Sequence, residues 1–118
     1  LPIKIFILNN EYMGMVRQWQ ELLHDKNYSE SYTAALPDFV KLAEAYGCVG
    51  MRATTPEELD DKIIEMLNTE RPVIFDCRVD KVENCFPMIP SGKPHNQMLL
   101  GPNDQKEKKI TGKGKTLV

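Results

Sequence analysis

The amino-acid sequence predicts an α/β fold: an incomplete three-layer parallel sheet with helical crossovers, followed by an extended C-terminal tail. Helical and strand patterns alternate over the first 80 of 118 residues. The first strand candidate, residues 3–8, is almost continuously apolar, as strands buried on both faces of a parallel sheet are. After Asp80, three closely spaced prolines at positions 87, 90 and 94 exclude a regular element. The chain opens inside this strand pattern without a methionine, so we expect a truncated sequence.

The first strand is expected to end at Asn9-Asn10, a pair with turn chemistry. Residues 13–23 then predict a helix, because apolar residues recur at helical spacing and form one stripe; they are Met15, Val16, Trp19, Leu22 and Leu23. Gly14 weakens the first helical turn by up to ~1 kcal/mol relative to alanine. We therefore infer that another group approaches the backbone closely there. Arg17 is expected to face solvent.

A second helix is predicted over residues 37–46, with Pro37 in its first turn and Gly47 as its C-cap. Its expected buried face comprises Phe39, Leu42, Ala43 and Tyr46, while Lys41 faces solvent. A short strand follows at residues 48–53.

A third helix is predicted to start at Thr55-Pro56, where Glu58 completes a capping box. Four apolar residues of this helix are expected to face the core: Leu59, Ile63, Met66 and Leu67. The last strand, residues 73–79, places Asp76 and Arg78 on one side. The resulting order of strand, helix, helix, strand, helix, strand is typical of a sheet with helical layers on its faces.

Composition and charge exclude several classes of protein. The net charge of −2 implies no strong field toward nucleic acid or an anionic membrane. No apolar run approaches the ~20 residues that span a bilayer, and the start of the chain lacks the flanks of a signal peptide. Cys48, Cys77 and Cys85 show no CxxC spacing, which predicts buried thiols in a reducing, cytoplasmic setting. His24 and His95 have no second ligand at metal-binding spacing.

Asn9-Asn10 is the first candidate site. In open α/β sheets, ligands bind outside the carboxyl ends of the strands, and amide or main-chain carbonyl oxygens suit Mg²⁺. Taken alone, such a pair is more often only a turn, so both explanations remain open at this point.

Several stretches resemble one family in the right order. Residues 4–10 and 13–20 resemble the second half of the thiamine-diphosphate fold signature, and 37–45 and 85–92 are similar to acetolactate synthases (acetohydroxyacid synthases) in particular. The resemblance is to the C-terminal part of the catalytic subunit and covers residues 1 to about 100. It implies thiamine diphosphate and Mg²⁺ as cofactors of the complete enzyme.

The resemblance implies roles for particular residues. Asn10 is similar to the Mg²⁺ ligand, and the main-chain carbonyl of Tyr12 to a second ligand. Asn9 resembles a supporting residue of the turn. The backbone near Gly14 and Met15 is expected to run past the cofactor diphosphate.

The resemblance also implies a substrate channel lined by Met15 and Trp19, with Trp19 shaping the pocket for the acceptor 2-ketoacid. Residues 86–92 are expected to fold over this channel, with Ser91 at its edge. The alternative is that Met15 and Trp19, one turn apart on an apolar stripe, are core residues. The segment 86–90 is then an ordered strap without substrate contact.

We expect residues 1–80 to form the C-terminal half of a thiamine-diphosphate-binding domain and residues 81–118 a tail. Of the tail, 81–100 is expected to be an ordered strap and 101–118 flexible. No Gly-Asp element precedes Asn9, so the family's aspartate ligand is missing. The glutamate that activates the thiazolium ring belongs to another domain and comes from a neighbouring subunit. We therefore expect no catalytic residue in this chain and no synthase activity from it alone.

The resemblance implies that the complete enzyme decarboxylates pyruvate and joins the two-carbon unit to a second 2-ketoacid, in branched-chain amino acid biosynthesis. It also implies a homo-oligomer, a dimer or higher, and a regulatory subunit. Two alternatives stay open: another thiamine-diphosphate enzyme, such as a glyoxylate carboligase or a 2-ketoacid decarboxylase, or a non-catalytic α/β interaction module.

Overall fold

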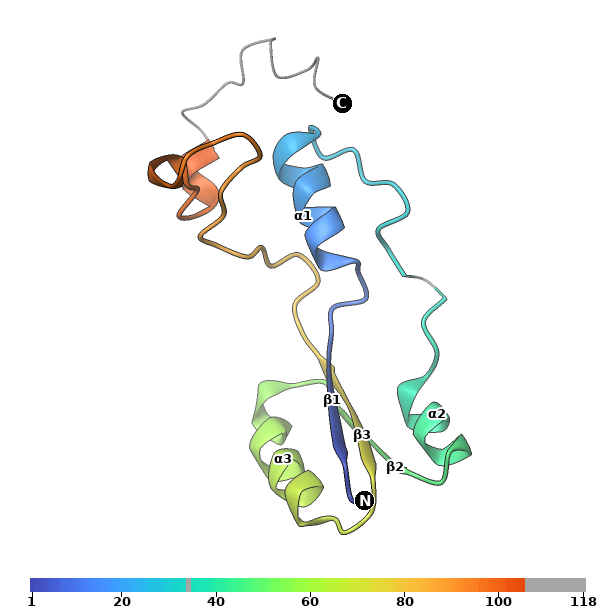
Figure 1. Cartoon of the computed structure of the whole chain (residues 1–118). Coiled ribbons are helices and arrows are strands. Elements are labelled where there is room, and N and C mark those ends of the chain that lie inside the picture. Colours follow the sequence, from blue (N-terminus) through green and yellow to red (C-terminus); the bar gives the residue numbers. More distant parts are fainter. Residues whose placement is uncertain (34, 106–118) are drawn as a thin grey trace.

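The protein is described by a computed structural model that covers residues 1–33 and 35–105. Its regular elements are β1 (Lys4–Asn9), α1 (Gly14–Leu23), α2 (Phe39–Ala45), β2 (Val49–Ala53), α3 (Leu59–Asn68) and β3 (Val73–Arg78) (Figure 1). Short 3₁₀ turns lie at Pro56–Glu58, His95–Gln97 and Pro102–Gln105. This order confirms the predicted alternation. The last of these turns lies in the stretch expected to be flexible, whose remainder, 106–118, is outside the described residues.

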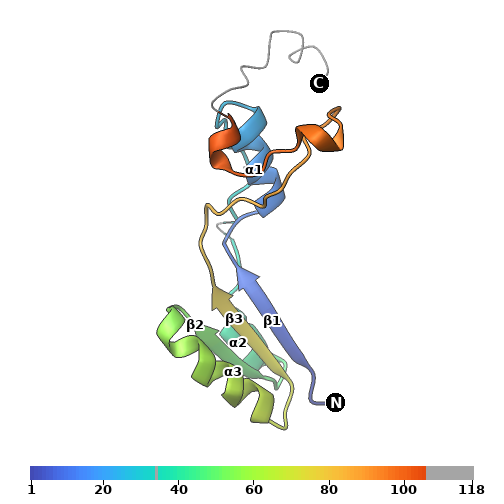
Figure 2. The same cartoon turned by 90° about the vertical axis from the view of Figure 1, so that its left-hand side faces the viewer.

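The three strands form one parallel sheet in the order β1-β3-β2, so the last strand in sequence is central. Phe75 of β3 is level with Phe6 on one side and Met51 on the other. Helices α2 and α3 lie on opposite faces of the sheet, which gives the predicted three layers (Figures 1 and 2). Because the strands are parallel, the carboxyl ends of all three lie at the same edge of the sheet.

The core lies on β3 and its contacts with β2 and α3. Val73, Phe75 and Cys77 are buried there, packed with Met51, Ala53 and Met66. On the other face, α2 lies directly against β2, because a Cβ at Gly50 would come within 2.6 Å of the Val40 carbonyl oxygen. This packing fixes where the carboxyl ends of the strands lie.

β1 is an edge strand, so the expectation that it is buried on both faces is wrong for this chain. Ile3, Ile5, Phe6 and Leu8 all expose more than a third of their surface, from 39% for Phe6 to 68% for Leu8. The apolar pattern identified a strand of a parallel sheet correctly, but within the described residues β3 is its only strand neighbour.

Three expectations for α2 and α3 are also wrong. Tyr46 and Leu67 point away from the sheet, with 77% and 64% of their surface exposed. Pro37 precedes the helix instead of starting it, because Asp38 is the N-cap and its carboxylate accepts the N–H groups of Val40 and Lys41. Gly47 has a φ of 69°, the left-handed conformation expected of a residue that ends a helix.

Helix α1 stands beyond the carboxyl ends of the strands, beside the C-terminal segment (Figure 1). Its buried residues are Arg17 and Gln18, only 1% and 2% exposed, so the expectation that Arg17 faces solvent is wrong. Met15, Val16 and Trp19 are exposed instead. The reason is that the segment packed against this helix presents polar backbone groups.

The cysteines are free, but only Cys77 is buried; Cys48 is half-buried and Cys85 is exposed, so the expectation of buried thiols holds for one of them. Within residues 1–33 and 35–105, no helix has the length and apolar character needed to cross a membrane.

Candidate functional site

The turn after β1, residues 9–12, is built by the two asparagines. The side-chain oxygen of Asn9 accepts the N–H of Glu11 at 3.0 Å, and that of Asn10 accepts the N–H of Tyr12 at 3.1 Å. These contacts are the local turn chemistry that asparagine favours. Glu11, which follows the two asparagines, has a φ of 60°, so the chain reverses sharply at this residue. The 9–12 turn thus brings Asn10 Oδ1 and the Tyr12 backbone into one tight structure.

A second segment, residues 31–33, fastens the far side of the turn. The Ser31 carbonyl accepts the N–H of Met13 at 2.8 Å. Thr33 donates to the Glu11 carbonyl through its N–H at 2.9 Å and its hydroxyl at 2.7 Å. In the described part of the chain, the Tyr12 carbonyl accepts no hydrogen bond. The Glu11 carbonyl is thus occupied, whereas that of Tyr12 is open to a ligand.

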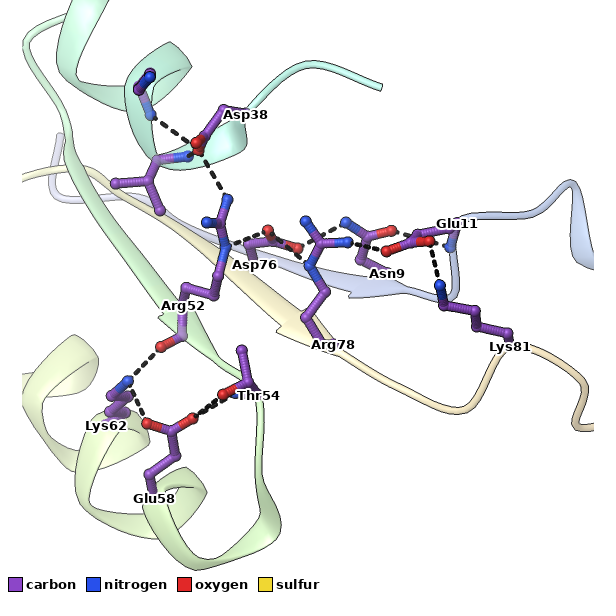
Figure 3. Close-up of polar contacts among 12 residues, drawn as sticks. Asn9, Glu11, Asp38, Arg52, Thr54, Glu58, Lys62, Asp76, Arg78 and Lys81 are labelled. Atoms are coloured by element: carbon purple, nitrogen blue, oxygen red, sulfur yellow. Dashed lines mark hydrogen bonds and ion pairs between the residues drawn. The ribbon is translucent and has the colours of Figure 1, made fainter. Parts of the chain in front are cut away.

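A network of polar and charged side chains joins the turn to the ends of the strands (Figure 3). At its centre is Asp76 of β3, which is 0% exposed. Its Oδ1 accepts from Asn9 Nδ2 at 2.8 Å, and its Oδ2 from Arg52 Nε at 2.9 Å, with Arg78 Nε at 3.3 Å. These residues come from β1, β2 and β3, so the network joins the ends of all three strands.

The outer members of the network complete the pairing. Arg52 also contacts Asp38 at 2.7 Å, while Arg78 and Lys81 both contact the Glu11 carboxylate at 2.5 Å. Beside these groups lies an open hollow of about 260 Å³, lined by Glu11, Tyr32, Thr33, Leu36, Pro37, Asp38, Arg52 and Arg78. The hollow lies at the carboxyl edge of the sheet, where ligands of α/β proteins bind.

The pairing favours the charged forms of Glu11, Asp38 and Arg52. The hydrogen bond from Lys81 lowers the pKa of Glu11 most. For Asp38, desolvation opposes the charged form, but hydrogen bonds from Arg52 and from the helix N–H groups outweigh it and lower the pKa. The hydrogen bond to Asp76 raises the pKa of Arg52. The carboxylates at this edge are therefore engaged by cationic side chains.

The 9–12 turn carries two neutral oxygens of the kind that suit Mg²⁺, Asn10 Oδ1 and the carbonyl of Tyr12. Within residues 1–33 and 35–105, no group of three or more His, Cys, Asp or Glu side chains could hold a metal ion. Mg²⁺ is held by few protein ligands, commonly one or two carboxylates, together with phosphate oxygens and water. The turn thus fits part of such a site, and its own carboxylate, on Glu11, is paired with Arg78 and Lys81.

Gly14 lies where a neighbour approaches closely, as expected. A Cβ at this position would be 3.0 Å from Asn10 Nδ2. α1 has no side-chain hydrogen bond at its N-cap, Met13, and no acidic residue in its first turn. Its first N–H groups therefore face the turn without a competing anion, which suits a negatively charged ligand.

Met15 and Trp19 are not core residues of this chain. They are 53% and 42% exposed. With Val16, Gln20 and His24 they line an open, mainly apolar hollow of about 400 Å³. The explanation of this pair as core packing is therefore wrong.

The C-terminal strap, residues 81–100, is anchored on the opposite face of α1. Arg17 donates to the Glu83 carbonyl at 2.8 Å and to Asn84 Oδ1 at 2.7 Å. Gln18 exchanges two hydrogen bonds with the backbone of Cys85, at 2.9 and 2.7 Å. Ser91 is exposed and does not line the hollow beside Met15 and Trp19. The structure thus gathers Asn9, Asn10, Tyr12 and Gly14 but leaves Ser91 apart from Met15 and Trp19.

The sequence pattern places Asp76 and Arg78 on one side of a strand, but it indicates no role for these two residues or for Arg52. The available signal was two charged residues, two positions apart, at the carboxyl end of an otherwise apolar strand. Their common partner, Asn9, lies 67 residues away from Asp76 in sequence.

Comparison with known proteins supports the resemblance. Residues 1–77 match the family described as thiamine pyrophosphate enzyme, C-terminal TPP binding domain. The acetolactate synthase large subunit of Cyanidium caldarium is 50% identical over 100 residues, 84% of this chain and 17% of the relative. That of Haemophilus influenzae is 43% identical over 101 residues, 85% of this chain and 18% of the relative.

The acetolactate synthase isozyme 3 large subunit of Escherichia coli is 41% identical over 108 residues, 89% of this chain and 19% of the relative. The chain therefore spans less than a fifth of the length of these three relatives. The matched family and the parallel sheet agree with each other: the chain belongs to the C-terminal TPP-binding domain family of thiamine pyrophosphate enzymes, and its relatives over most of its length are acetolactate synthase large subunits.

Proposed function

We propose that this chain is the part of an acetolactate synthase that supplies one side of the site for Mg²⁺ and thiamine diphosphate. The complete enzyme decarboxylates pyruvate and joins the two-carbon unit to a second 2-ketoacid, in branched-chain amino acid biosynthesis. The three relatives reported above carry the acetolactate synthase name. This supports the proposal over a glyoxylate carboligase, a 2-ketoacid decarboxylase or a non-catalytic module.

The observation that carries the proposal is the 9–12 turn. It presents Asn10 Oδ1 and the unoccupied carbonyl of Tyr12 beside the uncapped start of α1. Oxygen donors suit Mg²⁺, and free helix N–H groups suit a diphosphate. In this proposal Asn9 supports the turn, and the backbone at Gly14 and Met15 faces the diphosphate. The cofactor, when bound, supplies the carbanion chemistry, and the protein positions it.

The exposed apolar face of α1 supports the substrate channel. Met15 and Trp19 line a hollow of about 400 Å³ that suits the alkyl group of a 2-ketoacid. For Ser91 to line the same channel, the segment after Met88 has to fold across α1 from the face on which the strap is anchored.

We propose that the chain has no synthase activity alone, because the carboxylate of its 9–12 turn, on Glu11, is paired with Arg78 and Lys81 instead of being free for the metal. The relatives are named large subunits. We extend this to a cytoplasmic homo-oligomer that binds a regulatory subunit.

The test uses Mn²⁺, a paramagnetic substitute for Mg²⁺, together with thiamine diphosphate. Amide resonances of residues 10–15 should broaden selectively in the folded chain, and Asn10→Ala should abolish the effect. Asn68→Ala is the matched control, because Asn68 ends α3, away from the turn. Broadening that does not depend on Asn10 would refute the metal role.

Two further measurements complete this test. Incubation of the chain with pyruvate, thiamine diphosphate and Mg²⁺ should yield no acetolactate. Calorimetric titration should show no tight saturable binding of the cofactor, and clear saturation would contradict the view of an incomplete site.

A further inference from the structure

Asp76 is a fully buried carboxylate on which three donors converge, from Asn9, Arg52 and Arg78 (Figure 3). It lies on the central strand, 0% exposed, and packs between the ends of β1 and β2. A buried charge is costly unless it is paired and hydrogen-bonded. The three donors meet that condition here, so the geometry around Asp76 is tightly constrained.

These contacts reach two residues of the 9–12 turn, Asn9 and Glu11. On one side, Asp76 Oδ1 accepts from Asn9 Nδ2 at 2.8 Å, and Asn9 Oδ1 in turn accepts the N–H of Glu11. On the other side, Arg78 bridges from Asp76 to the carboxylate of Glu11. Glu11, the residue with positive φ, is thus held in two ways: Asn9 binds its backbone N–H, and Arg78 binds its side chain. Both Asn9 and Arg78 contact the Asp76 carboxylate.

We propose that Asp76 is a positioning residue for the 9–12 turn. Its two carboxylate oxygens hold the turn through Asn9 and through Arg78. The turn can then present Asn10 Oδ1 and the Tyr12 carbonyl in one orientation. This inference rests on the proposed function, since it takes those two oxygens as cation ligands. Groups that orient metal ligands in this way govern metal affinity without touching the metal.

The decisive variant is Asp76→Asn, which keeps the shape of the side chain. An amide offers one acceptor oxygen and an NH₂ group where three donors converge, so the contact to Asn9 or the contacts to the arginines must be lost. Asp38→Asn is the matched control. It removes the same charge from the partner of Arg52, has no contact with the turn, and keeps a good helix N-cap.

Arg78→Gln is the second variant, because Asp76→Asn could prevent folding of the central strand. Arg78 ends β3 with 30% of its side chain exposed, so its loss breaks the bridge to Glu11 with less risk to the core. The fold of each variant is checked by circular dichroism.

Two readouts are measured on the whole chain by NMR. Without metal, Asp76→Asn and Arg78→Gln should shift the Asn9 side-chain amide and the backbone amides of residues 10–12, and Asp38→Asn should not. With Mn²⁺ and inorganic pyrophosphate, the Mn²⁺ concentration that half-broadens the Tyr12 amide should rise about tenfold or more in the first two variants. A purely structural role would leave that concentration unchanged.

The outcomes separate the two proposals. If the folded Asp76→Asn chain shows an unmoved turn, or a moved turn with unchanged Mn²⁺ affinity, the positioning role is overturned. Should Asp76→Asn not fold, the same criteria apply to Arg78→Gln. If Mn²⁺ broadens no turn resonance even in the unsubstituted chain, the proposed metal site fails. The metal-free shifts then still decide whether Asp76 holds the turn.

Discussion

Gly14 and Asn10 face each other at the start of α1. The missing side chain of Gly14 leaves room for the Asn10 amide, which would otherwise be 3.0 Å from a Cβ. A glycine at this position costs helix stability, up to ~1 kcal/mol relative to alanine. The sequence pattern indicated a close approach here, and the structure identifies the Asn10 side chain as the approaching group.

Gly14→Ala should therefore weaken cation binding without lowering the stability of the fold. The Asn10 amide is the free end of a side chain and can move by the few tenths of an ångström required, so the unfolding temperature should stay level or rise. The displaced amide should weaken Mn²⁺ binding at the turn, by up to about tenfold. Thermal denaturation and Mn²⁺ broadening measure the two effects. Gly101→Ala is the control, since its Cβ would meet nothing within 4 Å; equal losses of binding in both variants would contradict this explanation.

At the scale of elements, α1 buries its polar face and exposes its apolar one. Arg17 and Gln18 bind backbone groups of the strap, and an extended segment with unpaired carbonyl and N–H groups needs such partners when buried. The apolar face, with Met15 and Trp19, is left open. The amphipathic pattern therefore predicted the helix correctly but its buried side wrongly.

Replacing Arg17 should release the strap. Arg17→Met removes the donors to Glu83 and Asn84 and leaves these partly buried acceptors unsatisfied. We expect a loss of about 2–4 kcal/mol in the free energy of unfolding. Hydrogen exchange at the Cys85 amide should become faster than in the unsubstituted chain.

Lys41→Met, at an exposed cation of α2, should change stability by no more than about 0.5 kcal/mol. Unchanged protection of the Cys85 amide in Arg17→Met would contradict the anchoring role.

The start of α3 should show a defined pH dependence. The Glu58 carboxylate accepts from the Thr55 N–H at 3.1 Å, which is the contact that the predicted capping box requires of this side chain. It also accepts from Lys62 at 2.6 Å and from the Thr54 hydroxyl at 2.9 Å. These contacts, with Lys62 first, lower the pKa of Glu58 from 4.5 to about 2. Because the folded pKa is the lower one, the stabilisation is fully present above pH 4.5 and is lost as the pH falls toward 2.

The measurement is the unfolding temperature across that pH window. Glu58→Gln should flatten the acid-side decline, and salt should reduce the effect because the group is partly exposed. Glu57→Gln, in the solvent-facing part of the same 3₁₀ turn, is the control. A decline of equal size in the Glu58 variant would exclude this carboxylate as a source of the pH dependence.

At the scale of the whole molecule, β1 is an edge strand of the sheet that the described residues form. Edge strands usually carry charges or other features that discourage pairing with a second chain. The charged residue of β1 is Lys4, and its ammonium group is turned back onto the carbonyls of Thr69 and Arg71 at 2.6 and 2.8 Å. The exposed residues Ile5, Phe6 and Leu8 are all apolar. This edge therefore favours self-association.

Sedimentation of the chain should show an average mass that rises with concentration. Ile5→Lys should lower this self-association, because it places a charge on the open strand. Tyr46→Lys is the matched control, since Tyr46 is an exposed apolar residue at the end of α2. A monomer at all concentrations, or equal effects of both substitutions, would contradict association through β1.

The sequence alone determined which elements form. Local signals suffice for this: the apolar run of β1 is a pattern of neighbouring residues, and Asn9 and Asn10 each accept the backbone N–H two positions further on. The tertiary structure decided which faces are buried. The open edge of β1 and the buried Arg17 depend on which segments pack nearby. So does the Asp76 network, since it joins residues up to 67 positions apart. No short-range periodicity encodes contacts over such separations, because they exist only once β3 lies between β1 and β2.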